Sequence, residues 1–265
     1  DRYDDSMEAY FAAKLRLFAR QTSTDIAIVN ADRPESARVE AITAARIIRV
    51  STSRAIAGGV YIDDGMIVSE VHGAPEAVMP VSAIRLKGSH NLANVLEAIA
   101  AVAALGLPVT TASDVLTRFR GVPNRLEEVE TVAGVTFYND SQGTTPIAVR
   151  MALLAFAETP PVLIAGGRAK VSDFSELGHD IATTARALIA IGESAEAIAT
   201  ATRAVKASFP IFFADTLSNA VRMGFALAQP FGVVLLSPAC ASFDMFRNME
   251  QRGEVFRQAV AELHA

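Results

Sequence analysis

The sequence predicts an α/β protein whose second half forms a doubly wound parallel sheet. From Gly134 onward, five short apolar strands each precede a stretch with helical spacing of its apolar residues. Strands that alternate with helices of this length are typical of βα units in a parallel sheet. The strands are expected at residues 135–138, 162–165, 188–191, 211–213 and 233–236, and the helices at about 146–156, 174–185, 195–205, 217–228 and 243–263.

The first half has a less regular pattern. Helices are expected over residues 7–20, 89–106 and about 112–119, a buried strand over 25–29, and a hairpin around the turn Asp63-Asp64-Gly65. On the first helix Lys14 lies within an apolar stripe, which is unusual for a lysine. We place the domain boundary at residues 121–123, where the helical region ends, so that the domains span 1–121 and 122–265.

Composition narrows the classes of function. The 265 residues are 51% hydrophobic, enough for the cores of two domains of roughly 150 residues or fewer. The net charge of −5 and the lack of a basic run argue against a nucleic-acid partner. No apolar stretch approaches the ~20 residues that span a membrane. A single cysteine, Cys240, excludes an internal disulfide and indicates a reducing cytoplasm. The start Asp1-Arg2-Tyr3, without an initiator Met, indicates a piece of a longer polypeptide.

Polar residues gather where three of the predicted strands end. The first strand runs into Asn139-Asp140-Ser141, the second into Gly166-Gly167 and then Lys170, and the last into small residues before Ser242. The carboxyl ends of parallel strands are where ligands bind in open α/β sheets. A lysine, hydroxyls and a helix N-terminus there suit an anionic small molecule. The structural alternative for the first segment is an Asx turn followed by a Thr helix cap.

Five blocks in order carry a resemblance to a known family. They read GSHNLANVLEAIAA, GVPNRLEEVE, GVTFYNDSQGTTP, LIAGGRAKVSDF and LLSPACASFDMFRNMEQRGEVF. Together with YFAAKLRLF near the start, they resemble the Mur ligases across the whole chain. The resemblance implies part of a P-loop-type central ATPase domain followed by a Rossmann-like domain. The motif G-x-x-x-x-G-K-[ST] does not occur in the chain, so we expect the P-loop, the UDP-binding domain and a metal-binding histidine upstream.

The resemblance also implies an activity. Within the family, the NDS-x-x-T block and the last block are most similar to the members that join D-glutamate to UDP-N-acetylmuramoyl-L-alanine. It implies an ATP- and Mg²⁺-dependent cytoplasmic ligase of peptidoglycan precursor synthesis, monomeric, that works through an acyl phosphate. This chemistry needs positioning and charge stabilisation rather than a protein nucleophile, and we interpret Cys240 as structural. The isolated chain is expected to be inactive.

Individual roles follow from the matched positions. The resemblance implies catalytic roles for Lys14, as a carbamate that holds magnesium, and for Asp140, which it also places at the nucleotide. It implies ATP contacts for Asn91, Asn94 and Arg125, and D-glutamate contacts for Thr144, Lys170, Ser242, Phe243 and Met249. The structural alternatives are a snorkelling side chain for Lys14, helix capping for the asparagines, and an ion pair with Glu127 or Glu128 for Arg125.

Four positions depart from the family pattern. Gln142 stands where a lysine is common, Asn124 where a histidine is usual, Arg168 where an acidic residue is frequent, and Met249 where a phenylalanine occurs. These departures leave open a ligase for L-glutamate or another amino acid. A non-catalytic binding module is the alternative if the natural protein begins near Asp1.

Overall fold

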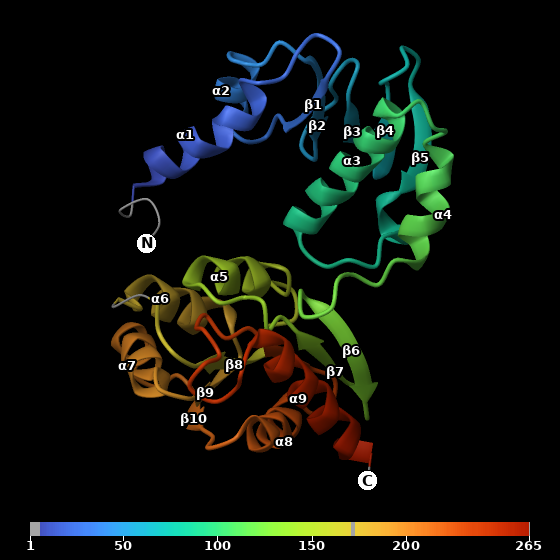
Figure 1. Ribbon diagram of the computed structural model, residues 1–265. Helices are drawn as coiled ribbons and strands as arrows, with labels where there is room; N and C mark the ends of the chain where they lie inside the picture. Colours follow the sequence, from blue (N-terminus) through green and yellow to red (C-terminus); the bar gives the residue numbers. More distant parts are fainter. Residues whose placement is uncertain (1–5, 171–172, 265) are drawn as a thin grey trace. The chain divides into compact units, whose positions relative to one another are not determined.

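The computed structural model describes residues 6–170 and 173–264, so Asp1-Arg2-Tyr3 and the Val171-Ser172 of the fourth block lie outside the described residues. The chain folds into two compact units, shown in Figure 1. The first contains residues up to Arg85 together with Ser89–Phe119, and the second contains Leu86–Gly88 and the chain from Arg120 onward. The assignment of ATP-binding and amino-acid-binding roles to residues 1–121 and 122–265 stays a prediction.

The first unit is built on a five-stranded sheet in the order β1-β2-β3-β4-β5. Its strands are β1 (Ile26–Asn30), β2 (Arg46–Ser51), β3 (Val60–Asp63), β4 (Met66–Ser69) and β5 (Glu76–Pro80). β1, β2 and β3 are parallel, whereas β3–β4 and β4–β5 are antiparallel. The predicted hairpin is confirmed: Asp64 and Gly65 both have positive φ, 43° and 73°, as a two-residue type I′ turn requires.

In its described residues this unit also contains four helices and a short 3₁₀ turn. They are α1 (Met7–Phe18), α2 (Ser36–Glu40), η1 (Val81–Ala83), α3 (Ser89–Ala104) and α4 (Thr110–Arg118). α3 packs along β1, β2 and β3 through a buried face that includes Val95, Leu96 and Ile99. No residue of α1 is buried, so the apolar stripe expected around Lys14 is not covered in the described structure. The sequence did not predict α2, β2 or β5.

The second unit contains a six-stranded sheet in the order β10-β9-β8-β11-β7-β6. The strands are β6 (Glu127–Val132), β7 (Val135–Asn139), β8 (Val162–Gly166), β9 (Ala187–Ile191), β10 (Ile211–Phe213) and β11 (Val233–Leu236). All pair in parallel except the edge strand β6, which the sequence did not predict and which is antiparallel to β7. The five predicted strands are confirmed.

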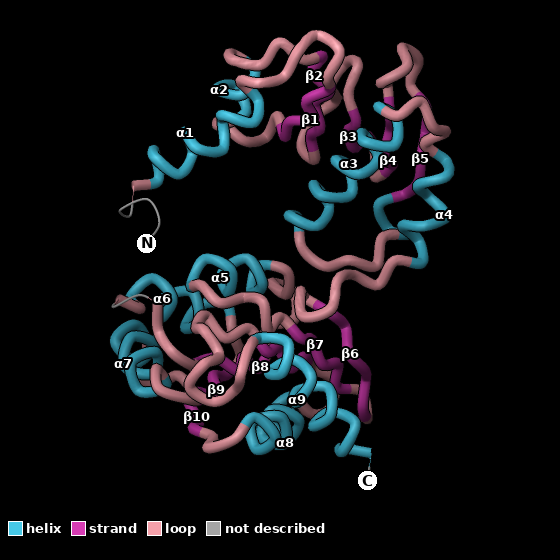
Figure 2. Tube along the Cα trace, viewed as in Figure 1, coloured by secondary structure: helices cyan, strands magenta, loops and turns pink. Residues whose placement is uncertain are grey.

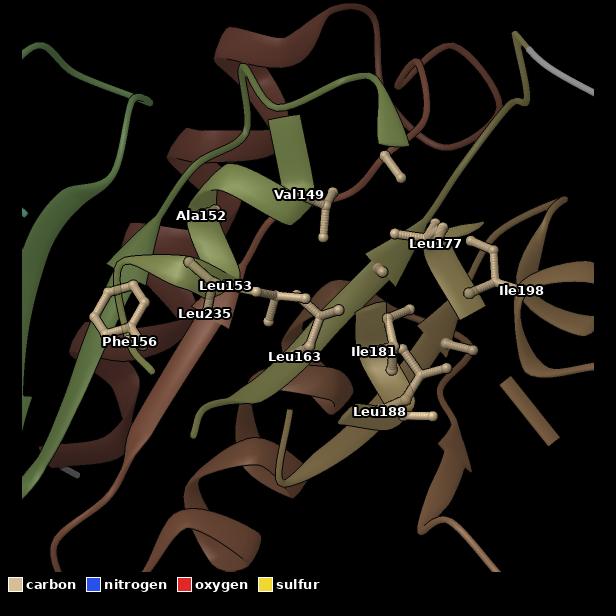
Figure 3. Packing of buried hydrophobic residues seen from close by; sticks show 14 of the residues in the cluster. Val149, Ala152, Leu153, Phe156, Leu163, Leu177, Ile181, Leu188, Ile198 and Leu235 are labelled. Atoms are coloured by element: carbon tan, nitrogen blue, oxygen red, sulfur yellow. The ribbon is translucent and has the colours of Figure 1, made fainter. Parts of the chain in front are cut away.

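Helices cover both faces of this sheet, as expected for a doubly wound fold (Figure 2). They are α5 (Pro146–Leu154), α6 (Ser175–Thr184), α7 (Ala195–Val205), α8 (Leu217–Ala228), α9 (Met249–Ala261) and the 3₁₀ turn η2 (Glu262–His264). On one face Val149, Leu177 and Ile198 of α5, α6 and α7 pack against Leu163 and Leu188 of the strands (Figure 3). A second cluster, with Phe137 and Phe256, fills the other face under α8 and α9.

The beginning of the last helix differs from the prediction. The sequence indicated a helix from about Phe243, but α9 begins at Met249, where Asn248 caps it by accepting from the amide of Gln251 at 2.8 Å. Before it, the amides of Met245 and Phe246 donate to the carbonyl of Ser242 and form a compact turn. Ser242 therefore lies in a loop and not at a helix N-terminus. The extended backbone of Asn248, with φ −163° and ψ 176°, separates this turn from α9.

Candidate functional site

The ends of β7, β11 and β8 lie side by side at one edge of the second sheet. Leu236 of β11 pairs with Asn139 of β7 on one side and with Ile164 of β8 on the other. The three polar segments that follow these strands are thereby brought together, as expected for carboxyl ends of neighbouring parallel strands. The candidate site is built from these three loops.

In the first loop, Asn139 and Thr145 form the Asx turn and the helix cap given above as the structural alternative. Asn139 Oδ1 accepts from the amide of Ser141 at 3.1 Å, which is an Asx turn. Thr145 is the N-cap of α5 and accepts from the amide of Ala148 at 3.4 Å, with Pro146 in the first turn. The turn and the cap explain Asn139 and Thr145 but leave Asp140 and Thr144 for other roles.

Asp140 is a buried carboxylate at the end of β7, only 6% exposed. Its Oδ2 accepts from Ser237 Oγ at 2.7 Å, and its Oδ1 accepts from the amide of Leu126 at 3.2 Å. Burial raises the pKa of Asp140 to about 6, because the loss of hydration outweighs these hydrogen bonds and the nearby charges of Arg125 and Arg252. The strand end therefore holds a carboxyl group that titrates near neutral pH.

Thr144 and Lys170 meet across the first and second loops. Lys170 Nζ donates to Thr144 Oγ1 at 3.2 Å, although the two residues are 26 positions apart. Lys170 is exposed and Thr144 is half-buried, so both remain open to a ligand from solvent. The contact places an ammonium group and a hydroxyl at one point of the sheet edge, which is a suitable pair for a carboxylate.

The third loop brings Ser242, Phe243 and Met249 to the same region. Ser242 is buried, whereas Phe243 is 62% exposed. The carbonyl of Met249 accepts from Ser141 Oγ at 2.8 Å, which connects the start of α9 to the end of β7. Cys240, in the same loop, is buried, and burial raises the pKa of its thiol, which agrees with a structural role.

Arg252 is a structural member of the site that the sequence reasoning missed. It is 1% exposed, and burial lowers its pKa to about 10, so it stays protonated at neutral pH. Its guanidinium donates to Ser141 Oγ at 3.0 Å, to the Ser141 carbonyl at 2.9 Å and to the Cys240 carbonyl at 3.2 Å. A sequence pattern could have identified it. Arg252 is followed at four-residue spacing by Phe256 and Val260, so it is a charged residue on an apolar helix face, as Lys14 is.

Arg125 lies near Asp140 but does not form the ion pair considered for it. Among the described residues, Glu127 pairs with Arg257 at 2.9 Å, and Glu128 accepts from the Tyr138 hydroxyl at 2.8 Å. Arg125 is exposed, and its charge lowers the pKa of Asp140 against the effect of burial. Its neighbour Asn124 is buried with a positive φ of 65° and accepts from Asn139 Nδ2 at 2.9 Å.

The remaining predicted site residues belong to the first unit. Asn91 and Asn94 lie in the first turns of α3, and Asn94 Nδ2 contacts Asn91 Oδ1 at 3.4 Å. Lys14 is exposed, with Nζ 5.3 Å from the centroid of the Tyr10 ring. The part of the chain that the structure describes contains no group of three or more His, Cys, Asp or Glu side chains that could hold a metal ion. It also contains no helix with the length and apolar character needed to cross a bilayer.

Comparisons with known proteins agree with this architecture. Residues 1–102 match the Mur ligase middle domain, and residues 124–240 match the glutamate ligase domain of the Mur ligases. A UDP-N-acetylmuramoylalanine–D-glutamate ligase of Pelotomaculum thermopropionicum is 42% identical over 258 residues, which are 97% of this chain and 56% of the relative. One of Acidobacterium capsulatum is 41% identical over 257 residues, 96% of this chain and 55% of the relative. The chain thus spans just over half the length of these relatives.

Solved structures share the fold at low sequence identity. The MurF ligase of Thermotoga maritima, in complex with ADP, has a TM-score of 0.67 and 16% identity over 97% of this chain and 58% of its own. The folylpolyglutamate synthase of Mycobacterium tuberculosis, with ADP and AMPPCP, has a TM-score of 0.65 and 16% identity over 96% of this chain and 61% of its own. With both domain matches and relatives that align along nearly all of its length, the chain belongs to the Mur ligase family, a family of ligase enzymes.

Proposed function

We propose that this chain belongs to an ATP-dependent ligase that adds D-glutamate to UDP-N-acetylmuramoyl-L-alanine in peptidoglycan precursor synthesis. In this proposal residues 1–121 contribute part of the ATP site, and residues 122–265 bind the amino acid. The protein would act as a cytoplasmic monomer without a nucleic-acid or membrane partner. The relatives named as D-glutamate ligases support the proposal.

The contact between Lys170 and Thr144 is the observation that carries the proposal. Their 3.2 Å hydrogen bond joins two loops at the sheet edge where Ser242 also lies. Glutamate has two carboxylates, so a site that binds it needs hydrogen-bond donors, such as an ammonium group and hydroxyls, at two separate positions. We assign Lys170 and Thr144 to one carboxylate, and Ser242, Phe243 and the Met249 backbone to the other end of the amino acid.

For the nucleotide, we assign Asp140 and Arg125 as contacts within the second unit and Asn91 and Asn94 as contacts within the first. A carboxylate beside an arginine, as Asp140 and Arg125 are, fits a ligand with both hydroxyl donors and phosphates. A carboxylate oxygen of UDP-N-acetylmuramoyl-L-alanine would bond to the terminal phosphorus of ATP while the bond to the β-phosphate oxygen breaks, giving an acyl phosphate and ADP. The glutamate nitrogen, once deprotonated, would then bond to the activated carbon as the C–O bond to phosphate breaks and phosphate departs with that electron pair.

Magnesium would be a cofactor of this reaction, with Lys14 as one contributor. Lys14 suits that role only as a carbamate, because an ammonium group repels the ion whereas carboxylate-like oxygens bind it. The described residues gather no acidic or histidine cluster around it, so by themselves they do not complete a magnesium site. We therefore assign no step of the reaction to the metal.

The experiment is phosphate release from ATP by the full-length protein, with UDP-N-acetylmuramoyl-L-alanine and either D- or L-glutamate. We expect release that depends on D-glutamate and that Lys170→Met suppresses. The control is Lys206→Met, an exposed lysine near Phe209 on another part of the unit. Release with L-glutamate alone would favour the alternative substrate that Gln142, Asn124 and Arg168 leave open. Release with neither would contradict the proposal.

A further inference from the structure

A pocket lies in the first unit, and none of the residues assigned to ATP or glutamate lines it. It has a volume of about 550 Å³ and is formed by the loop after β1, by α2, by β2 and by the loop after β2. Its charged lining residues are Arg33, Glu40, Arg49 and Arg54. The volume is within the range of small-molecule sites, roughly 300–1,000 Å³.

The sheet separates this pocket from α3. Ile48 and Val50 of β2 are buried, and α3 packs along β1, β2 and β3. Because side chains alternate along a strand, Arg49 projects from the opposite face, where it contacts Glu40 of α2. Asn91 and Asn94 are carried by α3. The pocket is therefore on the other side of the sheet from the asparagines assigned to the nucleotide.

The lining has an excess of positive charge. Among the described residues that line it, Glu40 is the one carboxylate, and Arg49 donates to both of its oxygens with hydrogen bonds of 2.8 and 2.7 Å. Arg33 and Arg54 are exposed, and among residues 6–170 and 173–264 neither forms a salt bridge. The Arg54 guanidinium donates a 3.4 Å hydrogen bond to the carbonyl of Ala31. Two guanidinium groups beside one pocket are thus without a salt-bridge partner in the described part of the chain.

The acidic residue Asp32 directly precedes Arg33 but does not line the pocket, and its carboxylate accepts hydrogen bonds from the loop after β2. Asp32 accepts from Ser51 Oγ at 2.6 Å, Ser53 Oγ at 2.7 Å, the Thr52 amide at 2.8 Å and Thr52 Oγ1 at 3.0 Å. Burial acts to raise its pKa, but these donors outweigh it and hold the pKa at about 2. Asp32 therefore stays ionised at neutral pH and fastens the two loops to each other, and among the described residues it forms no salt bridge with Arg33 or Arg54.

The same hydrogen bonds hold the arginines in ordered backbone. Arg33 follows Asp32 directly, and the amide of Arg54 donates to Ser51 Oγ at 3.1 Å. On the far side, the turn at Gly59 packs closely against β2, since a Cβ there would lie 2.3 Å from the Arg49 carbonyl oxygen and 3.1 Å from Ile56 Cγ2. Because these loops are already ordered, binding a ligand would cost less conformational entropy.

We propose that this pocket binds a small phosphorylated compound, with its phosphate between Arg33 and Arg54. Guanidinium groups present planar donor pairs that match phosphate oxygens, and two excess positive charges suit a dianionic or more highly charged group. The volume leaves room for an organic part beyond the phosphate. The inference does not depend on the proposed ligase function, because it concerns a pocket and residues that the ligase proposal does not use.

The test is calorimetric titration of the 265-residue chain with inorganic pyrophosphate at fixed, low ionic strength. We expect one saturable site whose affinity falls at least tenfold in the double variant Arg33→Gln/Arg54→Gln. The control Arg46→Gln removes an exposed arginine from the other end of β2 and should leave the affinity within twofold. Succinate, a dianion without phosphate, should bind much more weakly. Circular dichroism of each variant checks that the fold is retained.

Three results would overturn the inference. The first is the absence of saturable pyrophosphate binding, which would mean that the two arginines are merely solvated. The second is equal affinity in the wild type and the double variant. The third is a loss of binding on Arg125→Gln with no effect of the double variant, which would place the anion in the second unit.

Discussion

Arg252 of α9 holds Ser141 at the end of β7 through two hydrogen bonds, one to the hydroxyl oxygen at 3.0 Å and one to the carbonyl at 2.9 Å. A third bond reaches the carbonyl of Cys240 after β11. One buried guanidinium therefore connects two of the three loops of the candidate site. The Ser141 hydroxyl in turn donates a hydrogen bond to the Met249 carbonyl at 2.8 Å, at the start of α9.

Replacing Arg252 with methionine should lower the free energy of unfolding of the second unit by roughly 2–4 kcal/mol. The variant leaves the Ser141 and Cys240 carbonyls buried without their charged donor, and each such loss is costly. Urea denaturation measures the change. Arg247→Met, in the exposed segment before α9, is the matched control and should stay within about 0.5 kcal/mol of wild type. Equal losses in the two variants would contradict this role.

Asp140 should make stability depend on pH between about 4 and 6. Its pKa rises from an ordinary 3.8 to about 6 on folding, so the folded state binds the proton more tightly than the unfolded state does. Its contribution is fully present below pH 3.8 and is lost as the pH rises through 6, by up to roughly 3 kcal/mol.

The measurement for Asp140 is the free energy of unfolding of wild type and Asp140→Asn at a series of pH values. The wild type should lose stability relative to the variant as the pH rises across this window. Asparagine does not titrate, so only the pH dependence of the difference reports on Asp140. A constant difference from pH 4 to 7 would show that the carboxyl group has an ordinary pKa.

Gly143 should not tolerate a side chain. A Cβ at this position would lie 2.3 Å from Asp140 Oδ2 and 2.8 Å from Ser237 Oγ, two atoms that are themselves hydrogen-bonded. Gly143→Ala should therefore cost about 1–3 kcal/mol of unfolding free energy, the usual range for overpacking. In a Ser237→Ala background the same substitution should cost less, because one of the two contacts is gone. An undiminished cost in that background would argue against the clash.

Lys170 and Thr144 should act together on glutamate. In the full-length protein, Lys170→Met and Thr144→Val should each raise the KM for D-glutamate, by about tenfold or more, with a smaller effect on the KM for ATP. Because the two side chains touch, the double variant should lose less than the sum of the single losses in free energy. Steady-state kinetics of the four proteins measure the coupling. Strict additivity would mean that the two residues bind different groups.

Replacing Phe243 should weaken D-glutamate binding without changing the stability of the protein. Its side chain is 62% exposed, so Phe243→Ala should change the unfolding free energy by no more than about 0.5 kcal/mol. If Phe243 lies against the amino acid, as proposed, the KM for D-glutamate should still rise. Thermal unfolding and kinetics on the same preparations give both values. A large loss of stability with an unchanged KM would reverse the assignment.

The regular strand–helix alternation of the second unit could be predicted because each of those strands is a short run of consecutive apolar residues, which is recognisable without knowledge of the rest of the chain. The edge strand β6 escaped detection because it carries Glu127, Glu128 and Glu130. Distant partners accommodate these charges: Arg257 pairs with Glu127, and His264 contacts Glu130 at 2.9 Å. β2 was hidden in the same way, since Arg46 and Arg49 interrupt its apolar residues and Glu40 of α2 balances Arg49.

The sequence by itself determined which chemical groups follow the strands: Asp140 and Thr144 after one, Lys170 after another, Ser242 after a third. It did so because strand periodicity and turn residues act over a few positions. Only the tertiary structure decided which of them meet. β11 lies between β7 and β8 in the sheet, and Arg252 reaches Ser141 across 111 positions. Such pairings form only when the whole core is buried. A buried charged side chain is tolerated there only if each of its donors has an acceptor. Those acceptors are distant in the sequence, so no local sequence pattern indicates them.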